Sequence, residues 1–359
     1  MRTFVLIGTR PEAIKLAPVV RKLRVTDSEV LVGLSGQHGD LVAVILGDVG
    51  LSGLVNIGDF KRGRAMPQML SDLVMVVSRA ISRFAPDWIV VQGDTLTAYA
   101  GAVVGYLDGC RVAHVEAGLR TADLLSPFPE EGLRQMVSRI ATCHFAPTVL
   151  AFKNLTREGV EANRIHVVGN TVVDALDAIR KDVSWPFGFQ KPSGFTVLVT
   201  CHRRENLDEA IFSLCRFVRE EVGRGDTTFL LLKHANPIVR NAFDSVSDSE
   251  RVIALPPLSY CDMMGVLKHV DAVITDSGGI VEECTTIGTR VLIYRSKTER
   301  QEAVDVGSAR IAFSHAELMR GLRDCRAGTW RCEPSRVFGD GLASHRIVEI
   351  MERLTNDGN

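Results

Sequence analysis

The feature that most constrains the fold of this chain is an apolar, β-branched run that ends in a glycine turn, within residues 271–283. Asp271–Thr275 predicts a buried strand, and Ser277–Gly279 predicts a tight turn that opens a helix. Backbone N–H groups at such a helix start can face an anion, so the turn is a candidate phosphate site. The same succession also occurs for structural reasons alone, and the helix dipole by itself favours Glu282 and Glu283 in the first turn. The pattern therefore needs support from the rest of the chain.

The same alternation of apolar strands and helical patterns runs through both halves of the 359-residue chain. Strand, helix and strand in succession predict an α/β fold with two doubly wound parallel sheets. Residues 39–86 show helical and loop patterns only. The predicted strands are 4–7, 29–34, 88–92 and 111–115 in the first half and 195–200, 228–232, 252–255, 271–275 and 291–294 in the second.

The length of the chain favours two domains, because one hydrophobic core rarely organises so many residues. The pattern-poor run 181–193 is the best candidate for a linker. We expect an N-terminal domain over residues 1–175 and a C-terminal domain over residues 176–342. A terminal helix within 343–359 is expected to follow, packed on either domain.

Composition excludes several classes of partner. The chain has 42 basic and 43 acidic side chains, so no overall field attracts nucleic acid or an anionic membrane. Its eight cysteines form no C-x-x-C pair, which indicates reduced thiols in the cytoplasm. No apolar run has the length of a signal peptide core or a membrane span. We therefore expect a cytoplasmic enzyme whose anion binding is local.

Charged side chains follow several predicted strands. Arg10 and Lys15 come after the first strand, at the carboxyl end where open α/β sheets bind ligands. Asp94 and Glu116 each follow a later strand, and Glu130 lies at a predicted helix start. Any one of these acids is more commonly a helix cap or half of a surface ion pair. Three acids at matching positions favour a catalytic site.

His202 follows the first strand of the second half and stands beside Arg203 and Arg204. A lone histidine is more often a buried structural residue, but its cationic neighbours favour contact with a phosphate. The sequence has no Asp-x-Asp motif and no His and Asp cluster suited to a metal-bound diphosphate. We therefore expect activity without a metal ion.

Short motifs identify a family when they are taken together. They are GTRPEAIK (8–15), GDT (93–95), HVEAGLRT (114–121), SPFPEE (126–131), GNTVVDA (169–175), HRREN (202–206), DSGGI (276–280), TER (298–300) and GDG (339–341). This ordered set resembles the non-hydrolysing UDP-N-acetylglucosamine 2-epimerases over nearly the whole chain. The resemblance implies the glycosyltransferase B fold, with two Rossmann-like domains facing across a UDP-binding cleft. It also implies reversible conversion of UDP-N-acetylglucosamine to UDP-N-acetylmannosamine.

The resemblance implies roles for individual residues. Catalysis is expected from Asp94, Glu116, Glu130 and His202. Many bacterial members of the family also bind a second UDP-N-acetylglucosamine as an activator, and the candidate activator site here comprises Gln37, His38 and Arg64, with His234 nearby. Family members are typically homodimers, and neither a metal nor NAD is expected. Substrate binding is expected from Arg10, Lys15, Arg134, His234, Ser277, Gly278, Gly279, Glu283 and Arg300.

The chemistry explains why such residues are needed. The hydrogen on carbon 2 of a 2-acetamido sugar has no adjacent carbonyl, so direct deprotonation would give an unstabilised carbanion. Loss of UDP from carbon 1 would first create an oxocarbenium-like cation, and loss of the carbon 2 proton would then leave a 2-acetamidoglucal. Cations and helix-end amides suit the departing diphosphate, and carboxylates suit the sugar. Which acid serves as base stays open.

Four other functions remain open at this point. A hydrolysing epimerase would release N-acetylmannosamine and UDP. An epimerase for a modified UDP-2-acetamido sugar would share the same residues. A glycosyltransferase of this fold would need an acceptor groove, and a catalytically silent nucleotide-sugar sensor would have no use for unpaired carboxylates beside a diphosphate.

Overall fold

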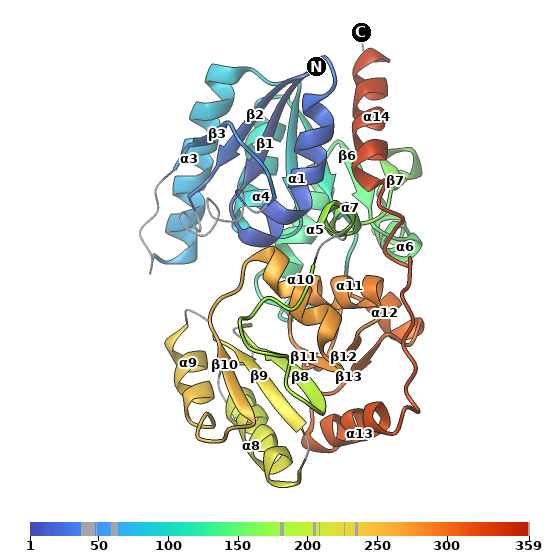
Figure 1. The fold of residues 1–359 in the computed structure, drawn as a ribbon. Coiled ribbons are helices and arrows are strands. Elements are labelled where there is room, and N and C mark those ends of the chain that lie inside the picture. Colours follow the sequence, from blue (N-terminus) through green and yellow to red (C-terminus); the bar gives the residue numbers. More distant parts are fainter. Residues whose placement is uncertain are drawn as a thin grey trace. The chain divides into compact units, whose positions relative to one another are not determined.

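The computed structural model describes residues 1–36, 47, 49–58, 64–179, 183–203, 206–207, 209–225, 227–233 and 236–357. The chain divides into two compact units, which are described separately (Figure 1). Unit 1 comprises Met1–Ala178 and Phe338–Asn359, and unit 2 comprises Ile179–Val337. The C-terminal segment thus returns to the unit in which the chain begins.

Unit 1 is built on a parallel sheet. Its described residues form seven strands in the order β3-β2-β1-β4-β5-β6-β7, and every neighbouring pair is parallel. β4 is buried along its whole length, as expected for a strand covered by helices on both faces. The strands are β1 (Arg2–Ile7), β2 (Glu29–Leu34), β3 (Leu54–Asn56), β4 (Trp88–Gln92), β5 (Arg111–Val115), β6 (Cys143–Ala146) and β7 (Ile165–Val167).

Helices connect these strands and cover the sheet (Figure 1). The terminal helix α14 packs beside α1 in unit 1, and the indole nitrogen of Trp88 donates a hydrogen bond to Thr355 Oγ1 at 2.8 Å. The helices of this unit are α1 (Arg10–Arg24), α3 (Met66–Phe84), α4 (Leu96–Leu107), α5 (Glu130–Ile140), α6 (Val149–Arg157), η1 (Ala162–Arg164), α7 (Thr171–Ile179) and α14 (Ala343–Asn356).

The expectation of helices and loops alone over residues 39–86 is wrong at β3. This strand pairs in parallel with β2, with Val32 opposite Leu54. It has only three residues, lies at the edge of the sheet and leaves Val55 44% exposed. A strand this short and exposed leaves no hydrophobic periodicity in the sequence.

Unit 2 contains a second parallel sheet. Its described residues form six strands in the order β10-β9-β8-β11-β12-β13, again all parallel. The strands are β8 (Phe195–Thr200), β9 (Thr227–Leu232), β10 (Val252–Leu255), β11 (Ala272–Thr275), β12 (Arg290–Ile293) and β13 (Ala309–Ile311). The helices are α8 (Glu209–Gly223), α9 (Pro237–Asp244), α10 (Tyr260–His269), α11 (Gly278–Ile287), α12 (Gln301–Asp305) and α13 (His315–Arg326).

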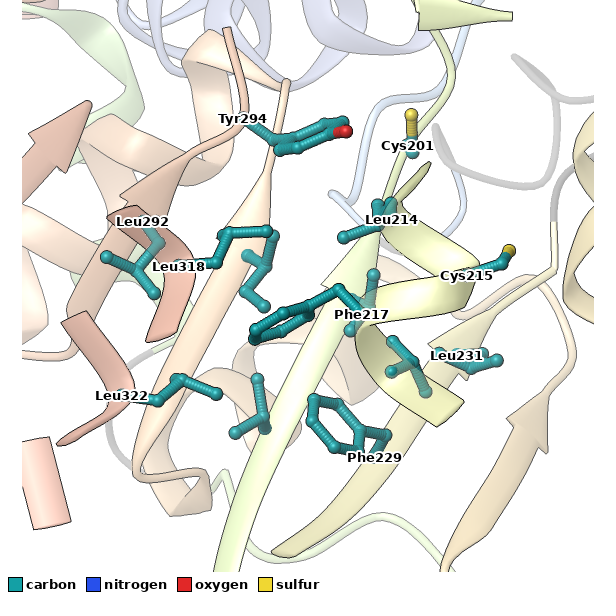
Figure 2. Close-up of a cluster of buried hydrophobic side chains, with 14 of the residues drawn as sticks. Cys201, Leu214, Cys215, Phe217, Phe229, Leu231, Leu292, Tyr294, Leu318 and Leu322 are labelled. Carbon is teal, nitrogen blue, oxygen red and sulfur yellow. The ribbon is translucent and has the colours of Figure 1, made fainter. Parts of the chain in front are cut away.

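The core of unit 2 joins helix α8 to the sheet. Phe217 of α8 lies among side chains of the sheet and of α13 (Figure 2). Its ring meets that of Phe229 edge to face, with 6.4 Å between centroids. Leu292 and Leu322 are fully buried in the same cluster. This packing fixes β8, β9 and β12, and with them the loops at their carboxyl ends.

Parallel pairing explains where functional side chains gather in each unit. The carboxyl ends of parallel strands meet at one edge of a sheet, which is where such sheets bind ligands. In unit 1 this edge carries the turns after β1, β4 and β5, including Asp94 and Glu116. In unit 2 it carries His202 after β8, Asp276 after β11 and Arg295 after β12.

Candidate active site

Asp94 lies directly after β4 and is held by an arginine. The preceding residue, Gly93, has a φ of +70°, a left-handed conformation that favours glycine and turns the chain sharply. The Asp94 carboxylate forms an ion pair with Arg134 of α5, which also donates to Glu131 Oε2 at 3.1 Å. Arg134 is only 3% exposed. The structure thus places this predicted substrate-binding residue against two carboxylates of its own unit.

Glu116 lies directly after β5 in an unusual backbone conformation. Its φ is +63°, a left-handed value that residues other than glycine, Asn and Asp rarely adopt and that often marks a functional position. The carboxylate accepts from Lys15 Nζ in an ion pair and from Asn170 Nδ2 at 3.2 Å. Both members of the ion pair are more than nine-tenths buried. The structure therefore pairs Lys15, a predicted substrate-binding cation, with a predicted catalytic acid.

Two adjacent acids begin α5, and the structure gives them different surroundings. Glu131 is fully buried and accepts hydrogen bonds from the backbone of Thr121 at 3.1 Å and from Arg134. Glu130, the predicted catalytic acid, is only partly buried. Both lie in the first helical turn, where the dipole favours negative charge. Glu131 therefore holds the loop before α5, and Glu130 retains access to solvent.

Glu12 and His114 support the two acid-bearing turns, and sequence reasoning missed both. Glu12 accepts from Gly8 N at 3.1 Å and from Thr95 Oγ1 at 2.9 Å, which ties β1 to the turn that carries Asp94. Burial raises the pKa of Glu12 to about 7, against the effect of these hydrogen bonds. The Nε2 atom of His114 lies 2.8 Å from the carbonyl oxygen of Gly93, and burial lowers the pKa of this histidine to about 4.

In unit 2, Asp276 organises the loop that carries His202. Its carboxylate accepts from the backbone nitrogens of His202 and Arg203, both at 2.9 Å, and from Asn206 Nδ2 at 3.0 Å. His202 Nδ1 lies 3.1 Å from Asp276 Oδ1. Burial alone would raise the pKa of Asp276, but the His202 imidazole and these hydrogen bonds outweigh it and hold the pKa well below its usual range. The histidine side chain, 41% exposed, is thereby held at the strand end through its Nδ1 atom.

The glycine turn before α11 packs against Arg300. Ser277 is the N-cap residue, and Gly278 and Gly279 are the first two residues of the helix. A Cβ atom on Gly278 would lie 2.7 Å from the guanidinium carbon of Arg300, so any other residue here would require Arg300 to move. The helix start therefore presents backbone N–H groups with a guanidinium directly beside them, a combination suited to an anion.

Arg300 belongs to a buried ionic cluster. Its Nε donates to Glu282 Oε1 at 2.9 Å and its Nη1 to Glu299 Oε1 at 2.5 Å. Glu299 also accepts from Arg295 at 2.6 Å and from Arg203 at 3.2 Å. Three guanidinium groups thus share two carboxylates, and each is held in place by at least one of them. Sequence reasoning predicted Arg300 but not Glu299, its neighbour in the same motif.

The remaining predicted residues lie in varied surroundings. Glu283, the predicted ribose ligand, is 6% exposed. Burial and then the charge of this carboxylate raise the pKa of Tyr260. Arg10 is the first residue of α1 and is partly buried, and Arg64 forms an ion pair with Asp72 at the surface. Three predicted residues lie outside the described part of the chain, namely Gln37, His38 and His234.

The described residues contain neither a metal-binding cluster nor a helix that could cross a membrane. In the ranges given above, no group of three or more His, Cys, Asp or Glu side chains is placed to hold a metal ion. None of the helices in these ranges combines the length and the apolar character needed to cross a bilayer.

Comparison with known proteins identifies the family. The family model described as UDP-N-acetylglucosamine 2-epimerase matches residues 22–352. The UDP-N-acetylglucosamine 2-epimerase of Bacillus subtilis (strain 168) is 35% identical, over 97% of this chain and 94% of that protein. This chain belongs to the UDP-N-acetylglucosamine 2-epimerase family. The predicted family is therefore confirmed.

Solved structures confirm the predicted fold. The crystal structure of the UDP-GlcNAc 2-epimerase from Neisseria meningitidis bound to UDP-GlcNAc superposes with a TM-score of 0.92 and 29% identity, covering 98% of this chain and all of that one. The spinosyn forosaminyltransferase SpnP, at a TM-score of 0.58 and 16% identity over 99% and 98% of the two chains, shares the fold alone. The family model spans strands of both sheets, and the Bacillus relative aligns over 97% of this chain.

Proposed function

We propose that this chain reversibly epimerises carbon 2 of UDP-N-acetylglucosamine to give UDP-N-acetylmannosamine, and that it does so without net hydrolysis. The observation that carries the proposal is the set of carboxylates at one sheet edge of a chain that belongs to this family. Asp94 and Glu116 follow adjacent parallel strands, and Glu130 opens the helix that also supplies Arg134. The bound UDP-GlcNAc of the Neisseria relative supports the choice of substrate.

The proposed reaction begins at carbon 1. The bond between carbon 1 and the diphosphate oxygen breaks, and its electron pair leaves with UDP. A carboxylate then removes the carbon 2 proton, and the electrons of that C–H bond form the carbon 1 to carbon 2 double bond of 2-acetamidoglucal. A carboxylic acid returns a proton to the opposite face of carbon 2, and the UDP oxygen attacks carbon 1 again. Atoms and charge balance, and no water is consumed.

We assign the proton transfers to the acids of unit 1. Glu116 is the best placed by its surroundings, because Lys15 offsets its charge and Asn170 fixes its direction. Asp94 is similarly restrained by Arg134. Negative charge at these positions would also stabilise an oxocarbenium-like transition state. The partition of base and acid among Asp94, Glu116 and Glu130 is a matter for mutagenesis.

We assign the diphosphate to the helix start of unit 2. The N–H groups of Gly278 and Gly279, the Arg300 guanidinium and the exposed His202 ring are groups that stabilise a departing anion. The buried carboxylates of Glu282 and Glu299 hold Arg300 in advance, so little reorganisation is needed when charge develops. Glu283 is assigned to the ribose.

The test is proton NMR of the protein with UDP-N-acetylglucosamine in deuterium oxide, with EDTA present because we propose that no metal is required. The proposal predicts deuterium at carbon 2 and an equilibrium mixture of both UDP sugars. Steady accumulation of UDP and free N-acetylmannosamine would instead identify the hydrolysing reaction. Unlabelled substrate after long incubation, with and without additional UDP-N-acetylglucosamine as activator, would reject this substrate and favour a modified sugar.

Two further proposals concern the state of the enzyme. We propose a homodimer, on the strength of the family resemblance, and mass measurement in solution tests it. We also propose that the enzyme works in the cytoplasm, because its eight cysteines are all free thiols, as is usual in a reducing compartment. Localisation of a tagged copy tests that assignment.

A further inference from the structure

Asn170 is a buried polar residue that the assignments above use only in passing. It lies between β7 and α7 and is 2% exposed. Its backbone nitrogen donates to the carbonyl oxygen of Phe338 at 2.6 Å, in the segment that returns from unit 2. Its side chain makes two more hydrogen bonds, to Val172 and to Glu116. Its carbonyl oxygen accepts from the backbone nitrogen of Val173 at 3.0 Å, so each polar group of this residue has a defined partner.

These contacts fix the orientation of the Asn170 side chain. Oδ1 accepts from the backbone N–H of Val172 at 3.1 Å, the usual bond of an N-cap residue at the start of a helix. An amide whose oxygen accepts from an N–H must point its nitrogen the other way. Nδ2 therefore faces Glu116 Oε2 at 3.2 Å as a donor. The cap of α7 thus dictates which atom meets the carboxylate.

The carboxylate that Asn170 meets has an unusual need for support. Glu116 occupies a left-handed conformation, and such strain persists only where surrounding contacts enforce it. The Lys15 ammonium contacts the same oxygen, Oε2, but an ammonium on a flexible stem supplies charge more than direction. An amide held at both ends supplies direction without changing the net charge. The two donors are therefore complementary.

We propose that Asn170 is a positioning residue for the epimerisation, which orients the Glu116 carboxylate without touching the sugar. This inference rests on the proposed function, in which Glu116 is one of the three acids assigned to the proton transfers at carbon 2. Because its backbone nitrogen donates to Phe338, Asn170 also links the Glu116 carboxylate to the segment in which the chain re-enters unit 1.

Other charged and titratable groups surround Glu116. Lys15 reaches it from α1. His114, on the strand that precedes Glu116, is influenced by the charges of Arg120, Asp94 and Glu116. Burial keeps the pKa of His114 at about 4, so this ring stays neutral throughout the neutral range. On α7, burial raises the pKa of Asp174, which accepts from the backbone nitrogens of Ala343 and Ser344.

Asn170→Asp is the informative variant. Its Oδ1 can still accept from Val172 N–H, but its second oxygen replaces the donor that faces Glu116. Two carboxylates in contact cannot both ionise freely, so the acidic limb of the pH profile of kcat should move to higher pH by about one unit or more. At pH 7 we expect kcat to fall about tenfold or more, with KM changed less than threefold. A purely structural residue would not move the profile.

Asn154→Asp is the matched control. Asn154 Nδ2 donates to the carbonyl oxygen of Gly118 at 3.0 Å, in the same loop, and the substitution introduces the same charge. Its profile should coincide with that of the wild type. Equal shifts in Asn154→Asp and Asn170→Asp would overturn the proposal, because the effect would then be general electrostatics.

A second variant covers failure of Asn170→Asp to fold. Serine is a good N-cap residue but its side chain is too short to reach Glu116, so Asn170→Ser should preserve α7 and still lose about tenfold in kcat. Circular dichroism would verify its fold. Wild-type kcat in Asn170→Ser, or a wild-type pH profile in folded Asn170→Asp, would overturn the inference. Absence of carbon 2 exchange in the wild type would instead reject the proposed function.

Discussion

The contact between Gly278 and Arg300 makes a prediction about stability. Substitution Gly278→Ala would place a Cβ 2.7 Å from the guanidinium carbon and 2.9 Å from two of its nitrogens, which is closer than real Cβ atoms approach. A free arginine would move aside, but this one is held by Glu282 at 2.9 Å and Glu299 at 2.5 Å. Relief of the clash therefore requires at least one buried ion pair to break.

The size of the effect follows from these contacts. Removing one partner of a buried ion pair costs about 3–5 kcal/mol, and since Arg300 can keep one of two carboxylates we take about half of that, roughly 2 kcal/mol. Alanine in place of glycine in a helix returns up to about 1 kcal/mol. Gly279→Ala should show only this gain in helix stability and no clash, because its Cβ would meet only Ser277 Oγ, at 4.0 Å. We expect the two variants to differ in unfolding free energy by about 2 kcal/mol.

Urea denaturation, followed by circular dichroism and tryptophan fluorescence, measures this difference. Gly278→Ala should unfold at lower urea than the wild type, and Gly279→Ala at equal or higher urea. Both changes are Gly→Ala in adjacent positions of one helix turn, so propensity cancels between them. Equal midpoints for the two variants would refute the claim that Arg300 is locked in place by its carboxylates.

Three further predictions follow from unit 1. Gly118→Ala should abolish stable folding or lower the unfolding free energy by several kcal/mol. The reason is that φ is +93° at this position and the new Cβ would lie 2.3 Å from the carbonyl oxygen of Ala151. Thermal melting measures the loss, and a melting temperature equal to that of the wild type would contradict the prediction. The pKa of Glu12 is raised from 4.5 to about 7, so its stabilising contribution is present below pH 4.5 and lost as the pH rises through 7. Between pH 4.5 and pH 7, the unfolding free energy of Glu12→Gln should therefore rise by up to roughly 3 kcal/mol relative to that of the wild type. A difference between the two proteins that is independent of pH in denaturation experiments would count against the raised pKa. Asp94→Asn, Glu116→Gln and Glu130→Gln should each lower kcat by about 10²–10⁴-fold while UDP binding by calorimetry is retained, and wild-type turnover in any of them would remove that acid from the mechanism.

Much of the fold could be predicted because its strands are buried on both faces. β4 and β5 begin and end as predicted, since such strands show nearly continuous hydrophobic sequence. β3 could not be predicted, because Leu54–Asn56 is short, exposed and paired only with β2. The place of α14 also lay beyond the sequence, since its pairing with α1 depends on contacts such as Trp88 with Thr355.

The candidate site, like the fold, could be predicted only in part. Its acids could be predicted from their positions after strands, but their partners could not. Lys15 lies 101 residues from Glu116 and Asn170 lies 54 from it, so no local pattern connects them. Glu130 and Glu131 are adjacent in one helical turn, and only packing distinguishes the buried acid from the accessible one.

The central claim is that UDP departs before the carbon 2 proton, through a 2-acetamidoglucal. The most direct test supplies that compound together with UDP and follows the products by chromatography. The account predicts that the enzyme converts the pair into both UDP-N-acetylglucosamine and UDP-N-acetylmannosamine, and that Glu116→Gln does so far more slowly. Formation of neither sugar nucleotide by an enzyme that readily interconverts the two would contradict it.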